Sequence, residues 1–289
     1  MQSFIPYIIV LFAVNLAFCQ VIASGSGPVH EQTTFGPDMC QVAGIPDFNI
    51  SKVNTIPDYY QRDRSFGGFP GNGLTYCGPV AASNVLITLD RRSSLFVNDS
   101  ADTRLRQYRM ICSLGSSSYM GTGRDGVTAE GFCIGLQKYL DDYGIQARVS
   151  MDGYFDVEDR FRTGVTIPDM RKIKMHTFAD KAVWLNIGWY KSRKNDEYEK
   201  TGAHWVTVVG YGYNRNKKTP DCLIIHDSDT KGGLNDYIVP EVIGTGILTD
   251  DLTSFPRDAS GFRRFPIGKN KYGIICAAVY LEMIPPSAS

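Results

Sequence analysis

A cysteine, a histidine and an aspartate follow one another along the chain in contexts that suit nucleophilic catalysis. Cys77 stands at the start of a helical pattern whose apolar residues recur at the spacing of one helix face (Ala82, Val85, Leu86 and Leu89). A thiol at a helix start faces unpaired N–H groups and the positive end of the helix dipole, and both favour the nucleophilic thiolate. Alternatively, Cys77 is a half-cystine or a small core residue.

The histidine and the aspartate lie at the ends of two predicted strands. His204 begins an apolar run over residues 204–213, and Asp227 ends a second run over residues 222–227. If these strands pair across a four-residue turn at 214–217, His204 lies directly opposite Asp227, with Cβ atoms about 4.5–5.5 Å apart. The carboxylate could then hold one ring nitrogen and leave the other for a thiol. Alternatively, His204 is an ordinary strand-end histidine and Asp227 caps a turn.

Two neighbouring residues offer related chemistry. Asp229 competes with Asp227 as the carboxylate that orients the histidine. His226 is one residue from Asp227, so in a strand it points to the opposite face, and we expect a structural role for it.

These residue types predict covalent catalysis at a carbonyl carbon. Cys77 would attack the carbon, His204 would deliver a proton to the leaving group, and Asp227 would fix the tautomer of the imidazole. The oxyanion would need the backbone N–H of Cys77 and one side-chain amide. Asn72, five residues before Cys77, is the best-placed amide, whereas Gln61 is chemically better but lies sixteen residues before it.

Composition and charge exclude several other classes of protein. Of the 289 residues, 43% are hydrophobic and 21% are charged, which is ordinary usage for a globular protein. The formal net charge is zero, and no basic stripe or tail points to nucleic acid. The interior has no repeat and no linker-like shift in composition, which favours a single domain.

The N-terminus predicts export. An apolar run over residues 5–18 has about the length of a signal peptide and is too short for a comfortable membrane span. We expect residues 1–19 to be removed, although cleavage after Ala23 is an alternative. The sequons at Asn49 and Asn98 support a secretory route and glycosylation. No other stretch is long and apolar enough to span a membrane, so a secreted protein with no membrane attachment is predicted.

Cysteine usage leaves a tension with a free nucleophile. Six cysteines remain once Cys19 leaves with the signal peptide, and six could form three disulfides. If Cys77 is a free thiol, an odd number is left, although Cys112 and Cys133 bracket a Gly/Ser loop that a disulfide could staple. No cysteine or histidine spacing suits zinc, so neither a metal nor another cofactor is expected.

The predicted elements run from helices to strands. Helical patterns extend from Cys77 to about Leu89, from Asp102 to Met110, and from a cap at Thr128 to about Tyr143. Strand patterns cover residues 145–151, 181–190, 204–213, 222–226 and 272–283, residues 165–178 are ambiguous, and residues 228–271 are expected to be irregular with one strand near Tyr237. Helices followed by a sheet indicate an α+β fold.

Three motifs resemble the papain-like cysteine peptidases: Tyr-Cys-Gly-Pro-Val-Ala-Ala, Ala-His-Trp-Val-Thr-Val-Val-Gly-Tyr, and Ile-Ile-His-Asp-Ser-Asp. They look closest to the branch that contains the double-glycine leader peptidases. The resemblance implies an N-terminal helical part whose nucleophile helix packs on a C-terminal antiparallel sheet. It also implies hydrolysis of a peptide or protein substrate through a Cys77–His204–Asp227 triad and a thioester. The family usually has a glutamine shortly before the nucleophile, where this chain has Gly71 and Asn72.

On this reading residues 20–57 are a loose mature N-terminus or a short pro-region, and residues 58–289 form the papain-like catalytic domain. Two alternatives stay open. The same triad could serve an amidase or acyltransferase acting on peptide-like cell-wall material, because a thioester can be resolved by water or by an amine. The scaffold could instead be a catalytically inactive binding or structural protein, and a disulfide at Cys77 would favour that reading. The sequence carries no signal for an oligomeric state.

Overall fold

The computed structural model describes residues 20–21, 48–93, 102–178, 181–213, 222–230, 236–250 and 253–284. Four of the features expected from the sequence lie outside these residues: the signal peptide, most of the segment 20–57, the sequon at Asn98 and the turn at 214–217. For residues 20–21, 48–50, 90–93, 213 and 253–255 the structure describes the backbone alone.

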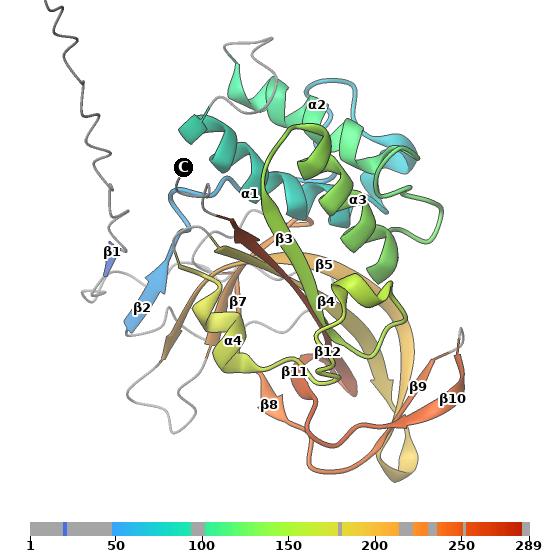
Figure 1. The fold of residues 1–289 in the computed structure, drawn as a ribbon. Helices are drawn as coiled ribbons and strands as arrows, with labels where there is room; N and C mark the ends of the chain where they lie inside the picture. The colour runs from blue at the N-terminus through green and yellow to red at the C-terminus, as the bar shows by residue number, and fades with distance from the viewer. Residues whose placement is uncertain are drawn as a thin grey trace, which may run out of the picture.

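The predicted α+β fold class is confirmed, because the described residues form four helices and a large, mostly antiparallel sheet (Figure 1). The described helices are α1 (Cys77–Ser93), α2 (Thr103–Gly115), α3 (Ala129–Asp142) and the short α4 (Met170–Met175). In Figure 1, α1, α2 and α3 lie together on one side of the sheet. None of the described helices is long and apolar enough to cross a membrane.

Four long strands form the centre of the sheet. They are β3 (Ala147–Gly153), β4 (Lys181–Ser192), β5 (Glu197–Tyr213) and β12 (Lys271–Met283). β4 pairs antiparallel with both β5 and β12, and β12 pairs with β3. The sheet is completed by shorter strands: β1 (Gln20–Val21), β2 (Phe48–Ser51), β6 (Cys222–Asp227), β7 (Tyr237–Ile238), β8 (Glu241–Val242), β9 (Ile247–Asp250), β10 (Thr253–Asp258) and β11 (Arg263–Gly268).

The central strands are buried on both faces, which explains their nearly continuous apolar runs. Alternate side chains of β4 point to opposite sides of the sheet. Trp184 packs in the core shared with α1 and α3, while Val183 and Leu185 pack in the core shared with α4. The sheet therefore lies between two apolar layers, and α1 is held against one of them.

Helix capping follows the sequence signals. The Thr128 hydroxyl accepts a hydrogen bond from the Gly131 N–H at 3.0 Å, as predicted for the start of α3. Asp102 caps α2 in the same way through the N–H of Arg104 at 2.8 Å. The polar run before Met110 is thus the first part of a helix that continues to Gly115.

Residues 228–271 are less irregular than expected. They contain the strand expected near Tyr237, which is β7, and also β8, β9, β10 and β11. These strands are short and lack clear alternation, so they form where a partner strand supplies hydrogen bonds rather than through local propensity. Cys112 and Cys133 are not joined, and none of the five described cysteines (Cys77, Cys112, Cys133, Cys222 and Cys276) is in a disulfide.

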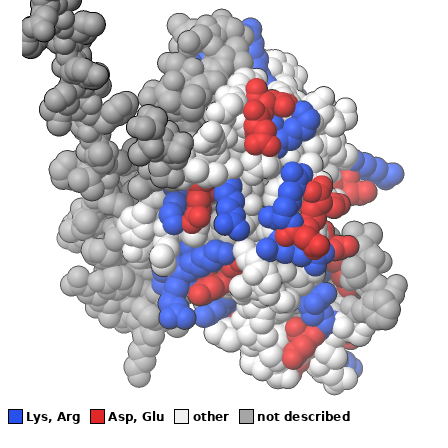
Figure 2. Space-filling view, viewed as in Figure 1, with Lys and Arg blue, Asp and Glu red and all other residues white. Residues whose placement is uncertain are grey.

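The charged surface is mixed in sign. On the face in Figure 2, lysine and arginine side chains lie beside aspartate and glutamate side chains. Ion pairs of the described residues include Lys181 with Glu282 at 2.8 Å and Lys138 with Asp142 at 2.5 Å.

Candidate active site

Cys77 is the first residue of α1 and is buried. Gly78 allows this close packing, because a Cβ there would lie 3.1 Å from the Val127 side chain. One turn further on, the Ala81 carbonyl accepts hydrogen bonds from the Trp184 indole N–H and the Thr207 hydroxyl, both at 2.8 Å. These two donors come from β4 and β5, so the beginning of α1 is tied to the strand that carries His204.

His204 contacts both of its predicted partners. Its Nε2 lies 2.6 Å from Oδ1 of Asp227, and both residues are buried. The Cys77 side chain lies close enough to the His204 ring to raise its pKa. Because Nε2 is engaged by the carboxylate, Nδ1 is the nitrogen that remains for the sulfur. The three residues that the sequence separates by 150 positions therefore meet at one point.

The strand register differs from the prediction. Asp227 pairs with Val206, so the expected direct opposition of His204 and Asp227 is wrong. β5 ends at Tyr213 and β6 begins at Cys222, so the connection is longer than the expected turn, and the register also shifts between Val208 and Gly210. A displacement of two residues keeps both side chains on the same face of the sheet, which is why they still meet.

Charge on each partner stabilises charge on the other. Burial alone would lower the pKa of His204, but the carboxylate of Asp227 and the Cys77 side chain raise that pKa well above its usual value. Burial alone would raise the pKa of Asp227, but the imidazolium and the Asp229 N–H, which donates to Oδ1 at 2.9 Å, hold it below the usual value. Both shifts favour an imidazolium beside a carboxylate over two neutral groups.

An indole ring covers one side of this pair. The rings of Trp189 and His204 are stacked, with centroids 5.9 Å apart and planes inclined by 23°. Trp189 is itself half-buried. The ring limits the access of water to the imidazole and leaves it less freedom to rotate.

The predicted oxyanion donor Asn72 is directed to solvent and to another side chain. Its side chain is exposed, its backbone has a φ of +57°, and its Oδ1 accepts a hydrogen bond from Arg64 at 3.3 Å. This position argues against Asn72 as the amide that faces a substrate.

Gln61 is the amide that the fold brings to the site. It is 2% exposed, and its Oε1 accepts a hydrogen bond from the Ser228 hydroxyl at 2.8 Å, one residue beyond Asp227. Its Nε2 faces the carbonyl oxygen of Leu74 at 3.5 Å, three residues before Cys77. Gly73 permits this approach, because a Cβ there would lie only 1.8 Å from the Gln61 carbonyl oxygen. A glutamine amide was chemically the better candidate, but the sixteen-residue separation of Gln61 and Cys77 gave no sign in the sequence that the two would meet.

The two competing residues have other partners. The Nε2 of His226 lies 3.0 Å from the Ile56 carbonyl oxygen, consistent with the expected structural role. The carboxylate of Asp229 receives two hydrogen bonds from Arg62, at 2.6 and 2.9 Å. Asp229 is therefore engaged elsewhere, and Asp227 is the carboxylate that orients His204.

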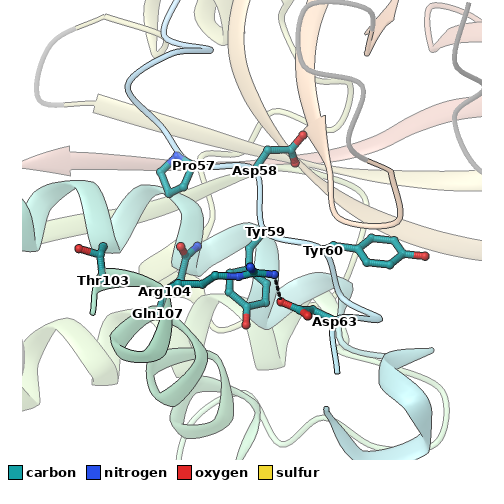
Figure 3. Close-up of a pocket in the computed structure, with 8 residues that line it drawn as sticks. All are labelled: Pro57, Asp58, Tyr59, Tyr60, Asp63, Thr103, Arg104 and Gln107. Carbon is teal, nitrogen blue, oxygen red and sulfur yellow. Dashed lines mark hydrogen bonds and ion pairs between the residues drawn. The ribbon is translucent and has the colours of Figure 1, made fainter. Parts of the chain in front are cut away.

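A separate pocket of about 340 Å³ lies beside the segment that carries Gln61 (Figure 3). Residues 57–60 and 63 line it together with Thr103, Arg104 and Gln107 of α2. Arg104 and Asp63 form an ion pair of 2.5 Å at its wall. None of its lining residues belongs to the triad, so this pocket is distinct from the candidate catalytic centre.

The remaining predicted positions are placed as follows. Asn49 lies on β2, whose backbone pairs with β5, and the second sequon, at Asn98, lies outside the described residues. Within the described part of the chain, no three His, Cys, Asp or Glu side chains gather in a way that could hold a metal ion.

No known protein-family model matches this sequence, and no curated protein is significantly similar to it.

Proposed function

We propose that the chain is a secreted cysteine peptidase with a papain-like arrangement, in which Cys77, His204 and Asp227 hydrolyse peptide bonds. One observation carries the proposal: a buried imidazole contacts both a thiol at a helix start and a carboxylate 2.6 Å away. This is the nucleophile, base and orienting group of covalent catalysis. The packing of α1 against β5 supports the papain-like arrangement.

The first half of the reaction forms a thioester. The Cys77 sulfur attacks the peptide carbonyl carbon, an S–C bond forms, and the π electrons move to oxygen. When the carbonyl re-forms, the C–N bond breaks and the leaving nitrogen takes the proton from Nδ1 of His204. The products are a free amine and an acyl group on Cys77. Asp227 holds the imidazole in the orientation that this transfer needs.

The second half releases the acid. Neutral His204 removes a proton from water while the water oxygen attacks the thioester carbon. The C–S bond then breaks, a carboxylic acid leaves, and the thiolate is restored beside the imidazolium. An amine in place of water would give acyl transfer.

The oxyanion of both steps would be bound by two donors. The backbone N–H of Cys77 is one of the first N–H groups of α1, which have no partner within the helix. The second donor is Nε2 of Gln61, which replaces the Asn72 expected from the sequence. Donors held in place before the reaction stabilise the developing charge without having to reorganise.

The state of Cys77 supports an enzyme over an inactive scaffold. Cys77 is not in a disulfide, and its sulfur faces a charged imidazole. Burying two charges carries a desolvation cost, so a buried carboxylate behind the imidazole fits a catalytic role better than a purely structural one.

Hydrolysis of a library of internally quenched fluorescent peptides by the purified mature protein tests the proposal. We expect cleavage by the wild type and by Cys112→Ala, and none by Cys77→Ala or His204→Ala. Adding a primary amine reveals acyl transfer as a new product by mass spectrometry. Full cleavage by Cys77→Ala would reject the triad, and transfer without hydrolysis would assign the chain as an acyltransferase.

A further inference from the structure

The residues on both sides of Asp227 hold a segment that is distant in the sequence. This segment, residues 56–62, is called the Gln61 segment below. His226 contacts the Ile56 carbonyl oxygen at 3.0 Å, and the Gln61 N–H donates to the Ser228 carbonyl oxygen at 2.7 Å. Asp229 forms its two-pronged ion pair with Arg62. At the end of β6, Asp227 therefore contacts the imidazole, while the residues on either side of it bind the Gln61 segment.

Hydrogen bonds within the turn after β6 hold Asp227 and the residues that follow it in place. The Asp229 N–H donates to Oδ1 of Asp227 at 2.9 Å, and the Thr230 N–H donates to the Asp227 carbonyl oxygen at 3.0 Å. Ser228, between them, is fully buried. A displacement of the turn would therefore move the orienting carboxylate and the Gln61 segment together.

Two contacts decide which way the Gln61 amide points. The Ser228 hydroxyl donates to Oε1 at 2.8 Å, so the oxygen end of the amide faces Ser228. The nitrogen end faces the Leu74 carbonyl oxygen at 3.5 Å. A rotation by 180° would set two carbonyl oxygens against each other at Leu74. One N–H of Nε2 then remains for an oxyanion formed at Cys77.

We propose that Ser228, supported by the Arg62–Asp229 ion pair, is a positioning residue that aims the Gln61 amide at the oxyanion. The inference rests on the proposed peptide hydrolysis and assigns separate roles to neighbouring residues at the end of β6. Asp227 orients the base, and the next two residues orient the oxyanion donor. Neither Ser228 nor Arg62 touches the reacting atoms.

The variant Ser228→Ala tests the hydroxyl. Its matched control is Ser83→Ala, because the Ser83 hydroxyl is equally buried, donates to a carbonyl and contacts a glutamine amide, that of Gln107. We expect Ser228→Ala to lower kcat roughly tenfold with little change in KM, which is less than the loss of a whole oxyanion donor. Ser83→Ala should leave kcat within about twofold, since its hydroxyl lies outside the site.

The variant Arg62→Gln tests the ion pair. Its control is Arg193→Gln, which removes another exposed arginine–carboxylate pair, that with Glu199. We expect a loss in kcat of about two- to fivefold for Arg62→Gln and none for the control, because exposed ion pairs contribute little unless they position a working group. Arg62→Lys should recover part of the loss, and raised salt should lower wild-type kcat but not that of Arg62→Gln.

Two thiol reagents separate positioning from general damage. Iodoacetamide alkylates the sulfur with loss of iodide and creates no oxyanion, so its rate at Cys77 should be the same in Ser228→Ala and wild type. The Cys77 sulfur adds to the carbonyl carbon of a peptide aldehyde, and the aldehyde oxygen takes the proton from His204. The resulting hemithioacetal oxygen occupies the oxyanion position. Its affinity should fall in Ser228→Ala by about the same factor as kcat, as expected for a contact made in the transition state.

The outcomes are distinct. Equal kcat in Ser228→Ala and Ser83→Ala overturns the inference. So does a fall in the alkylation rate of Ser228→Ala that matches its fall in kcat, because that would indicate a collapsed site. If the wild type cleaves no peptide, the proposed function fails on its own, and the side-chain amide resonances of Gln61 then decide the inference. They should shift in Ser228→Ala and not in Ser83→Ala, and unchanged resonances would reject the positioning role.

Discussion

The Asp227 carboxylate lies 2.6 Å from Nε2 of His204, although the strand pairing sets Asp227 opposite Val206. The two side chains are diagonal neighbours on one face of a twisted sheet, a distance that long side chains can span. This diagonal contact, rather than direct opposition, holds the imidazole toward Cys77. It also gives His204 its raised pKa, with consequences for the dependence of activity on pH.

Replacing Asp227 by asparagine should shift the pH profile as well as the rate. The pKa of His204 is raised by a negative charge, so removing the charge lowers that pKa. Activity that needs protonated His204 is lost as pH rises through this pKa, and the alkaline limb of kcat/KM should therefore move to lower pH in Asp227→Asn. We also expect kcat to fall about a hundredfold or more, because the imidazole loses its orienting partner.

Profiles of kcat/KM between about pH 5 and 10, a range that brackets the usual histidine pKa, check this expectation. Asp258→Asn is a suitable control, because Asp258 is exposed and its carboxylate bonds only with Ser260 among the described residues. An alkaline limb that stays in place in Asp227→Asn would show that another group controls it.

Gln61 and Asn72 should differ sharply when truncated. We expect Gln61→Ala to lower kcat about 10²–10³-fold, the cost of losing one oxyanion donor. Asn72→Ala should leave kcat nearly unchanged, because the Asn72 side chain is exposed and bonds to Arg64. Steady-state kinetics on one peptide decides between them, and the reverse order of effects would restore Asn72 as the donor.

Gly73 should be intolerant of a methyl group for a reason that Gly71 does not share. Both have positive φ, +75° and +61°, so alanine strains the backbone at either position by about 1–2 kcal/mol. A Cβ at Gly73 would also lie 1.8 Å from the Gln61 carbonyl oxygen, while a Cβ at Gly71 would have nothing within 4 Å. Gly73→Ala should therefore displace Gln61 and lower both Tm and kcat.

The pair of variants separates backbone strain from displacement of the amide. Thermal unfolding should show a loss in both, larger in Gly73→Ala, and only Gly73→Ala should lose activity at a temperature where both are folded. Equal activity in the two variants would mean that the approach of Gln61 to Gly73 is unimportant for catalysis.

Trp189 should protect the ion pair mainly through its ring. Stacked aromatic contacts contribute about 0.5–1.5 kcal/mol beyond burial, so Trp189→Ala should lower kcat by roughly two- to twelvefold. Trp189→Phe keeps a ring over His204 and should retain most of the activity. The comparison is made at fixed pH with the alkaline limb measured for both, and equal losses in the two variants would point to the indole N–H instead of the ring.

The local parts of this protein were predictable from its sequence. The start of α1 at Cys77, the cap at Thr128 and the central strands follow from periodicity and side-chain chemistry over short windows. The shared face of His204 and Asp227 was also predictable, because side chains alternate with a period of two and an even register shift preserves the face.

Only the tertiary structure decided the long-range relationships. The register of β5 and β6 depends on a longer connection and a bulge, which no apolar pattern encodes. The short strands β7 to β11 exist because partner strands supply their hydrogen bonds. Gln61 reaches the site because the chain folds back over Gly73 and is bonded to Ser228, a contact across 167 residues. A short stretch of sequence indicates only its own tendency to form a helix or a strand. The Gln61–Ser228 contact instead arises from the packing of segments that are distant in the chain.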